Sequence, residues 1–172
     1  MKKVFLVVLA VVIACTVFLF FKGRKMQVIT TEIEISAPPE KVWAIIADVN
    51  KWQDWSPIIN KSSGSVSEGS KLNITMKGKV EGEDGPQYSP TITKLDRPKF
   101  FRWRAYMLTG FLFTNDKIFE LEASSSGTRL IHKELFKGLL APLFCDHMET
   151  GVPPMLNAMN KALKELAEKP AL

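Results

Sequence analysis

Hydrophobic side chains fill the start of the chain without interruption. Residues 4–21 carry no charge, and fourteen of these 18 residues are Val, Leu, Ile or Phe. A helix of that length measures about 27 Å, close to the roughly 30 Å hydrocarbon core of a bilayer, and Lys3 and Lys22 can extend to the head groups. The fourteen large apolar residues contribute about −6 kcal/mol in favour of spanning. The pattern therefore predicts a single-pass membrane protein that contacts the lipid bilayer through residues 4–21, within an N-terminal anchor of residues 1–25.

Two other interpretations of this segment stay open. A cleaved signal peptide has a shorter apolar core and a small-residue cleavage site followed by polar sequence, whereas here the apolar run continues past Cys15. Residues 12–15 resemble a bacterial lipoprotein cleavage site, but mature lipoproteins usually continue with polar residues. We expect an uncleaved anchor. Basic residues flank both ends of the run in similar number, so the positive-inside rule favours neither side of the membrane.

From residue 26 onward the pattern changes to short segments in which apolar and polar residues alternate. A period of two is typical of a half-buried strand. Strands are expected at residues 28–36, 71–77, 88–95, 100–107, 111–123 and 128–136, with strand ends around a turn at 61–70, a loop at 81–86 and a hairpin turn at 124–127. Because these strands follow one another through short loops, the sheet is expected to be antiparallel.

Helical spacing of apolar residues appears on both sides of the strands. Residues 39–49 are expected to form a helix, since proline suits the first turn, and residues 51–56 a second short helix or turn. Residues 139–150 are expected to be helical in part. The glycine and prolines of residues 151–154 are then expected to break or kink the chain.

Residues 155–169 have the most regular helical pattern of the chain. Their apolar stripe consists of Met155, Met159, Ala162 and Leu166. Such a stripe has to be buried, and the inner face of the sheet is the surface available for it. Residues 26–172 are therefore predicted to form one α+β domain whose sheet curls around a long C-terminal helix.

The net charge of +5 belongs to the N-terminal segment. Residues 1–25 hold five basic and no acidic residues, which leaves 18 of each in residues 26–172. A nucleic-acid-binding domain usually carries a basic patch on its folded surface, so no nucleic-acid partner is expected. Cys15 and Cys145 form no disulfide framework or CxxC pair. With two histidines in the chain, we also expect no metal site, and no cofactor motif is present.

The last predicted strand combines polar and apolar side chains on one face. By the period of two, this face holds Leu130, His132, Glu134 and Phe136. If it points inward, His132 and Glu134 can orient a ligand or act as acid and base in an apolar pocket. Alternatively, they form structural hydrogen bonds with each other, or with Arg102 or Arg104 of another strand.

Two further groups of residues invite a functional interpretation. Trp52 and Trp55 are three residues apart and share one face of a helical turn, where they either line a cavity entrance or fix the short helices onto the sheet edge. Residues 145–147 place Cys, Asp and His side by side. Neighbours one and two apart on a helix point in different directions, so no catalytic triad follows.

The segment TEIEISAPPEKVWAIIAD at residues 31–48 resembles the opening of the polyketide cyclase/dehydrase-like group of the START-related SRPBCC superfamily. The similarity continues at residues 52–57 and recurs at 127–140 and 159–168, so it covers about residues 28–168. The resemblance implies a helix-grip fold with a deep apolar cavity between the sheet and the C-terminal helix. Many members bind lipids, sterols, polyketides or similar molecules, and a minority are enzymes. The tandem prolines at 153–154 are less usual for the group's uninterrupted last helix.

These observations give three hypotheses about function. Residues predicted to line the cavity are Trp55, Trp103, Phe113, Phe119, His132, Glu134, Met155 and Met159. The leading hypothesis is a membrane-tethered domain that binds a hydrophobic small molecule (a lipid, a quinone-like or a polyketide-like compound) without transforming it. The second is a cyclase- or hydrolase-type enzyme, which requires His132 and Glu134 to reach an open cavity. The third is a protein-interaction module at the membrane, in which the helix-grip surface binds another membrane component of unknown identity. A small or absent cavity and an exposed apolar patch around Trp52 and Trp55 would favour it.

Overall fold

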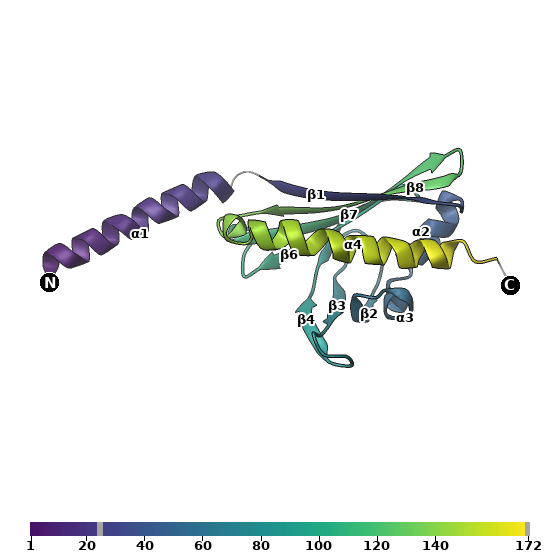
Figure 1. Ribbon diagram of the computed structural model, residues 1–172, viewed down its shortest axis with the longest axis horizontal. Helices are drawn as coiled ribbons and strands as arrows, with labels where there is room; N and C mark the ends of the chain where they lie inside the picture. The colour runs from purple at the N-terminus through teal and green to yellow at the C-terminus, as the bar shows by residue number, and fades with distance from the viewer. Residues whose placement is uncertain (24–25, 171–172) are drawn as a thin grey trace.

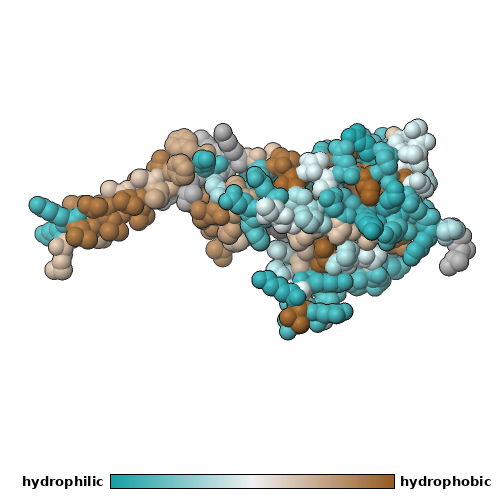
Figure 2. Space-filling view, viewed as in Figure 1, coloured by the Kyte–Doolittle hydropathy of each residue, from teal (hydrophilic) through white to brown (hydrophobic). Residues whose placement is uncertain are grey.

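The N-terminal apolar segment forms a separate helix that projects from one end of an α+β domain (Figure 1). The computed structural model describes residues 1–23 and 26–170. Helix α1 (Lys2–Gly23) is, among these residues, the one helix long and apolar enough to cross a membrane, and none of its apolar window is buried in the protein. A signal sequence near the N-terminus has the same length and composition. Figure 2 shows hydrophobic side chains along α1, whereas the visible face of the domain is mainly hydrophilic.

The domain contains two antiparallel sheets that together form a curved wall. In the larger sheet the order is β1 (Gln27–Ile35), β8 (Gly127–Lys137), β7 (Phe113–Ser124), β6 (Phe100–Met107) and β5 (Thr91–Asp96). In the smaller sheet it is β2 (Ile59–Gly64), β3 (Leu72–Lys77) and β4 (Asp84–Tyr88). The Leu72 amide donates to the Pro90 carbonyl at 2.9 Å, and the Ile92 amide donates to the Ser70 carbonyl at 2.9 Å, so backbone hydrogen bonds connect the two sheets.

Helix α4 (Cys145–Ala167) lies across the concave side of the sheets (Figure 1). The remaining helices are α2 (Pro39–Ala47), η1 (Val49–Lys51), α3 (Trp52–Trp55) and η2 (Ala141–Leu143). Proline occupies the start of α2 with an extended residue before it, as expected from its fixed φ and missing amide hydrogen. The predicted fold class, an antiparallel sheet wrapped around a long C-terminal helix, is confirmed.

The strand expected at residues 88–95 is in fact two strands. Strand β4 begins at Asp84, inside the predicted loop, and β5 begins only at Thr91. Pro90 separates them: it has no amide hydrogen for a ladder, while its carbonyl accepts the bond from β3 described above. The chain changes sheets at this proline, which alternation of side chains does not reveal.

A break or a kink was expected at residues 151–154. Helix α4 runs without interruption through Pro153 and Pro154, so a break is wrong. Two proline rings remove two backbone hydrogen bonds from the helix. Buried residues on both sides of the prolines, Met148 and Leu156 among them, pack into one cluster with the sheet. This tertiary packing holds the two halves of the helix together, as it commonly does where local propensity is poor.

The buried stripe of α4 also differs from the predicted one. Its members are Met148, Val152, Leu156, Met159, Asn160, Leu163 and Ala167. Met155 is 37% exposed, and Ala162 and Leu166 are half-buried. Of the predicted stripe, Met159 alone is fully buried. Met155 lies about 100° around the helix from Leu156 and lines the edge of a cavity, whereas Leu156 faces the packed core.

Candidate functional site

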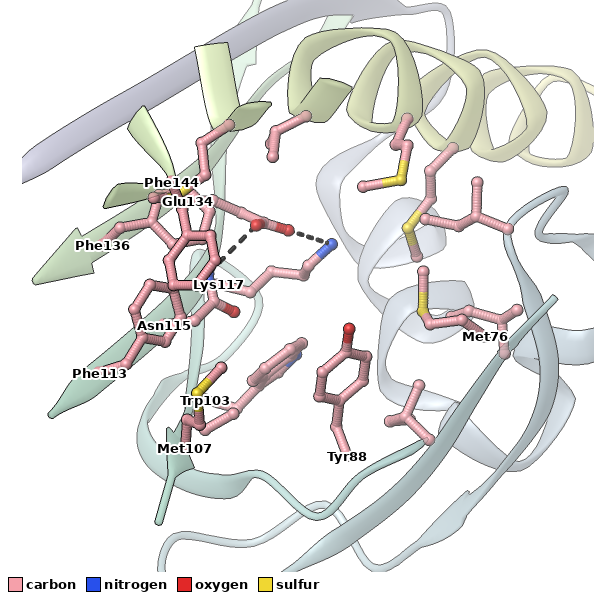
Figure 3. Close-up of a pocket in the computed structure, with 18 of the residues that line it drawn as sticks. Met76, Tyr88, Trp103, Met107, Phe113, Asn115, Lys117, Glu134, Phe136 and Phe144 are labelled. Carbon is pink, nitrogen blue, oxygen red and sulfur yellow. Dashed lines mark hydrogen bonds and ion pairs between the residues drawn. The ribbon is translucent and has the colours of Figure 1, made fainter. Parts of the chain in front are cut away.

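A cavity of about 300 Å³ lies between the concave side of the sheets and α4 (Figure 3). Its walls come from both sheets, from Trp52 of α3 and from α4 as far as Met159, and they are largely apolar. The volume is at the lower end of the range for small-molecule sites, roughly 300–1,000 Å³. Lining residues that are also exposed mark the opening: Tyr88, Tyr106, Met107, Phe144, His147 and Met155.

A buried ion pair stands on the sheet side of this cavity. Lys117 of β7 and Glu134 of β8 are direct partners in the strand register, so their side chains emerge next to each other on the inner face. Lys117 Nζ lies 2.8 Å from Glu134 Oε1, and each side chain is 9% exposed. Asn115 donates its side-chain amide to the other carboxylate oxygen of Glu134 at 3.1 Å. Glu134 is therefore fully engaged in an otherwise apolar space.

Two aromatic residues complete the polar end of the cavity. Lys117 Nζ lies 5.9 Å from the centre of the Trp103 ring. Within the described part of the chain, the buried indole nitrogen of Trp103 has no hydrogen-bond partner. Tyr88 points its hydroxyl into the cavity (Figure 3), and partial burial, followed by the charge of Glu134, raises the pKa of Tyr88. We call Tyr88, Trp103, Asn115, Lys117 and Glu134 the polar cluster.

The polar cluster defines what the cavity can hold. Trp103 offers a donor without a protein partner in the described residues, and Tyr88 keeps a neutral hydroxyl that can donate or accept. The rest of the wall is apolar and rich in methionine, which adapts to irregular shapes. The arrangement suits a mainly apolar molecule with an oxygen function, such as a carbonyl or hydroxyl, at one end.

His132 lies two residues from Glu134 on the same face of β8, yet it does not line the cavity. It is completely buried, and its ring stacks on Phe119 with 4.3 Å between centroids. Its Nδ1 lies 2.7 Å from the side-chain oxygen of Asn160 on α4, whose amide group donates to the Thr31 hydroxyl at 2.9 Å. Since the Asn160 oxygen can only accept, His132 Nδ1 carries the proton. This network joins β8, α4 and β1 above the core.

The stability of the protein is expected to fall below about pH 6.5 because of His132. Burial, together with the nearby charge of Lys117, lowers the pKa of His132 well below 6.5. The side chain therefore stays neutral in the folded protein at a pH at which it is protonated in the unfolded chain. The stability is therefore full above pH 6.5 and falls as the pH drops, by up to about 1.4 kcal/mol per pH unit. Urea unfolding between about pH 7.5 and 5 measures this slope.

Matched variants assign that slope to one side chain. His132→Phe should flatten the profile, whereas replacement of the exposed His147 by Gln should leave it as in the wild type. Asp116 titrates in a separate window. Burial alone would raise the pKa of Asp116, but hydrogen bonds from Arg104 and Arg102 lower this pKa from 3.8. The contribution of Asp116 to stability is therefore lost only in stronger acid. A slope that persists in His132→Phe would contradict the assignment.

The arginines of β6 face the opposite side of the sheet from the cavity. Arg102 and Arg104 both bind Asp116, which is 2% exposed on the outer face. The expected alternative, in which His132 or Glu134 pairs with one of these arginines, is therefore wrong. The physical reason is the period of two: Arg102 and Arg104 alternate with the inward-facing Phe101 and Trp103.

The structure brings five of the eight predicted cavity residues to the cavity. These are Trp103, Phe113, Glu134, Met155 and Met159. Trp55, Phe119 and His132 lie outside the lining. The ring of Phe119 is stacked between Phe101 and His132 in the core. Trp55 is half-buried and packs against the hydrophobic core. Trp52, by contrast, is 1% exposed, donates its indole hydrogen to the Ile46 carbonyl at 3.0 Å, and borders the cavity.

Three polar cavity residues were not predicted from the sequence: Tyr88, Asn115 and Lys117. In the predicted strand 111–123, Asn115 and Lys117 lie on the same face as Phe113 and Phe119, so two polar residues interrupt an otherwise apolar face. That interruption was a usable signal. Tyr88 carried none, because its position depends on where the chain changes sheets. In the described residues no cluster of His, Cys, Asp or Glu suits a metal ion.

Comparisons with known proteins agree on the fold. The profile of the family described as "Polyketide cyclase / dehydrase and lipid transport" matches residues 26–168. No curated protein sequence matches the chain. Among solved structures, the Zhui aromatase/cyclase from Streptomyces sp. R1128 is 17% identical, with a TM-score of 0.66 over 84% of this chain and 94% of that one.

Two more solved structures extend the comparison. The di-domain ARO/CYC BexL from the BE-7585A biosynthetic pathway is 13% identical with a TM-score of 0.67, and the match covers 85% of this chain. The chain spans about half of BexL, 51% of its length. Ara h 8.0201 is 15% identical with a TM-score of 0.66 over 83% of this chain and 98% of that one. At these identities the likeness establishes the fold.

Proposed function

Because the chain belongs to the polyketide cyclase/dehydrase and lipid transport family, we propose that it binds an apolar small molecule with one oxygen-bearing end inside the cavity. In this proposal α1 tethers residues 26–172, the ligand-binding domain, to a membrane, and the ligand is held without being transformed. The observation that carries the proposal is the apolar cavity with the polar cluster at one wall. An ordinary core has no such space, because protein interiors are packed as densely as organic crystals.

The residues around the cavity favour ligand binding over a role as a protein-interaction module. Trp52 is buried, and Trp55 is half-buried, so the exposed tryptophan patch that would favour a protein-interaction module is not formed. The domain begins at β1, only four residues after the end of α1. That short connection keeps the domain close to any membrane that α1 crosses, where apolar ligands are concentrated.

Filling the cavity should remove the ligand. Ala105 borders the cavity, so Ala105→Phe places a ring in the space that the ligand would occupy. Ala123→Phe makes the same change at an exposed position near the end of β7 and serves as the control. The full chain is extracted from membranes in mild detergent and examined by native mass spectrometry, followed by identification of the released molecule.

A species of one mass, bound one to one in the wild type and in Ala123→Phe and lost in Ala105→Phe, is the expected result. Wild-type protein without a bound species, or equal recovery from all three forms, would contradict the proposal. Thermal unfolding of the variants checks that Ala105→Phe is folded. The released molecule should be mainly apolar and carry at least one oxygen function.

A cyclase-type reaction is the second candidate function, and the ion pair in the cavity favours it. Of the two residues on which the enzyme hypothesis rests, Glu134 borders the cavity, whereas His132 does not. A carboxylate and an ammonium group 2.8 Å apart can exchange protons with a polyketide-like substrate. Incubation of the bound molecule with wild-type protein and with Glu134→Gln separates the two functions. A new product that forms only with the wild type would favour the enzyme.

A further inference from the structure

An exposed apolar surface surrounds part of the cavity opening. It consists of Tyr106, Met107, Leu108, Phe111, Leu143 and Phe144, which we call the apolar rim. Leu108 is 87% exposed, Leu143 is 61% exposed and Phe111 is 60% exposed. Single exposed apolar residues are ordinary, but a contiguous group of large ones marks a contact surface. Three members, Tyr106, Met107 and Phe144, also line the cavity.

Two uncharged segments form the rim, and hydrogen bonds hold them side by side. Residues 105–115 and 138–145 contain no Asp, Glu, Lys or Arg. The Leu139 amide donates to the Phe111 carbonyl at 3.0 Å, and the Leu140 amide donates to the Leu112 carbonyl at 3.0 Å. The turn before β7 is closed by the Thr114 hydroxyl, which donates to the Gly110 carbonyl at 2.9 Å. The exposed side chains therefore stand on an ordered surface.

The same segments meet the end of α1. The Gly138 amide donates to the Gly23 carbonyl at 3.1 Å, and the rings of Phe20 and Phe111 lie 6.4 Å apart. A Cβ atom at Gly23 would lie 2.3 Å from the Gly138 oxygen, so this close approach requires glycine. Figure 2 shows hydrophobic surface continuing from α1 onto the adjoining end of the domain.

We propose that the apolar rim inserts into the interface of the lipid bilayer that α1 crosses, and that the cavity opening thereby faces the lipid. The occupant is a lipid surface because the rim is continuous with the apolar surface of α1. It also lacks the charged residues that a polar protein partner would pair with. The cavity then exchanges its ligand directly with the bilayer, without passage through water. This inference rests on the proposed function in one respect, the membrane location of α1.

The depth of the rim in a bilayer can be measured on the full chain. In a background with Cys15→Ala and Cys145→Ser, a single cysteine replaces Leu108 and carries an NBD fluorophore. Val80, which is 59% exposed in the β3–β4 connection, is the control site. The protein is placed in phosphatidylcholine–phosphatidylglycerol vesicles, with and without lipids that carry a doxyl quencher near the head group.

Blue-shifted emission and strong doxyl quenching at position 108, with neither at position 80, are the expected results. A second label replaces Leu143, which is 61% exposed, and should behave in the same way. It keeps the test valid if the substitution at position 108 disturbs the structure locally. Water-like, unquenched emission at both rim positions would overturn the proposal. So would blue-shifted emission that doxyl lipids do not quench, because that result indicates a second copy of the chain or another protein on the rim.

The test separates this inference from the proposed function. If ligand is recovered from the wild-type cavity while the rim labels remain in water, docking fails and ligand binding stands. If the rim labels are quenched but no ligand is recovered, docking stands and ligand binding fails. Repeating the quenching with Ala105→Phe, which fills the cavity, should give the wild-type result, because rim insertion needs no ligand.

Discussion

Replacement of Lys117 by Met is expected to lower the free energy of unfolding by about 3 kcal/mol. The change leaves the carboxylate of Glu134, a buried side chain, without its ammonium partner inside a mainly apolar cavity. Loss of one partner of a buried ion pair costs about 3–5 kcal/mol. We expect the lower end, since Asn115 still donates a hydrogen bond to Glu134. Urea unfolding at pH 7 measures the change.

The chain offers a matched control and a rescue for this prediction. Lys133 pairs with Glu120 at 2.6 Å on the outer face of the same strands, where both side chains are 27% exposed. Lys133→Met should cost less than about 1 kcal/mol, because solvent stabilises the remaining charge. Lys117→Met combined with Glu134→Gln should recover most of the loss, since no buried charge is left unpaired. Equal effects of the two single substitutions would show that Lys117 and Glu134 are not buried from water.

The rescued double variant also separates the stability of the domain from its ligand binding. Its fold should be intact, while the charged part of the polar cluster is removed. If the ligand's oxygen end lies against this cluster, the double variant should retain less ligand than the wild type in the native mass spectrometry experiment. A hydrogen bond to a charged group contributes about 1.5–3 kcal/mol, which corresponds to a loss of affinity of about tenfold or more.

The fold was predictable because its signals are local. Alternation in residues 100–107 predicted β6 with its observed bounds. Alternation in residues 130–136 also placed Leu130, His132, Glu134 and Phe136 on one face, and all four are buried. The start of α2 followed from the conformational preference of proline. Each of these features depends on a few neighbouring residues, so the amino-acid sequence is sufficient to predict it.

The site was less predictable because the depth of a residue depends on distant segments. His132 and Glu134 share a face, and period two treats them alike. Asn160 of α4 covers His132 with a hydrogen bond, while the space beside Glu134 stays open as a cavity. No local pattern shows which of two equivalent positions another element will cover. The same reasoning applies to Tyr88, which depends on the change of sheets at Pro90.

Replacement of Leu156 by Ala is expected to cost about 3–4 kcal/mol of unfolding free energy, and it tests which face of α4 is packed. Leu156 is completely buried in a cluster with Ile29 and Phe136 of the sheet, just beyond the two prolines. Truncation leaves a cavity at the point where packing holds the helix together. The neighbouring Met155 is 37% exposed, so Met155→Ala should cost less than about 1 kcal/mol.

The two substitutions should separate ligand retention from stability, because Met155 lines the cavity and Leu156 does not. Met155 borders the cavity opening, so its truncation should change how much ligand is retained, with little change in unfolding. Leu156 does not line the cavity, and Leu156→Ala should lower stability while the folded fraction still retains ligand. Denaturant unfolding combined with native mass spectrometry of the same samples gives both readouts. If Met155→Ala were the more destabilising change, the packed stripe of α4 would be the one predicted from residues 155–169, and the cavity would have to lie on another face of the helix.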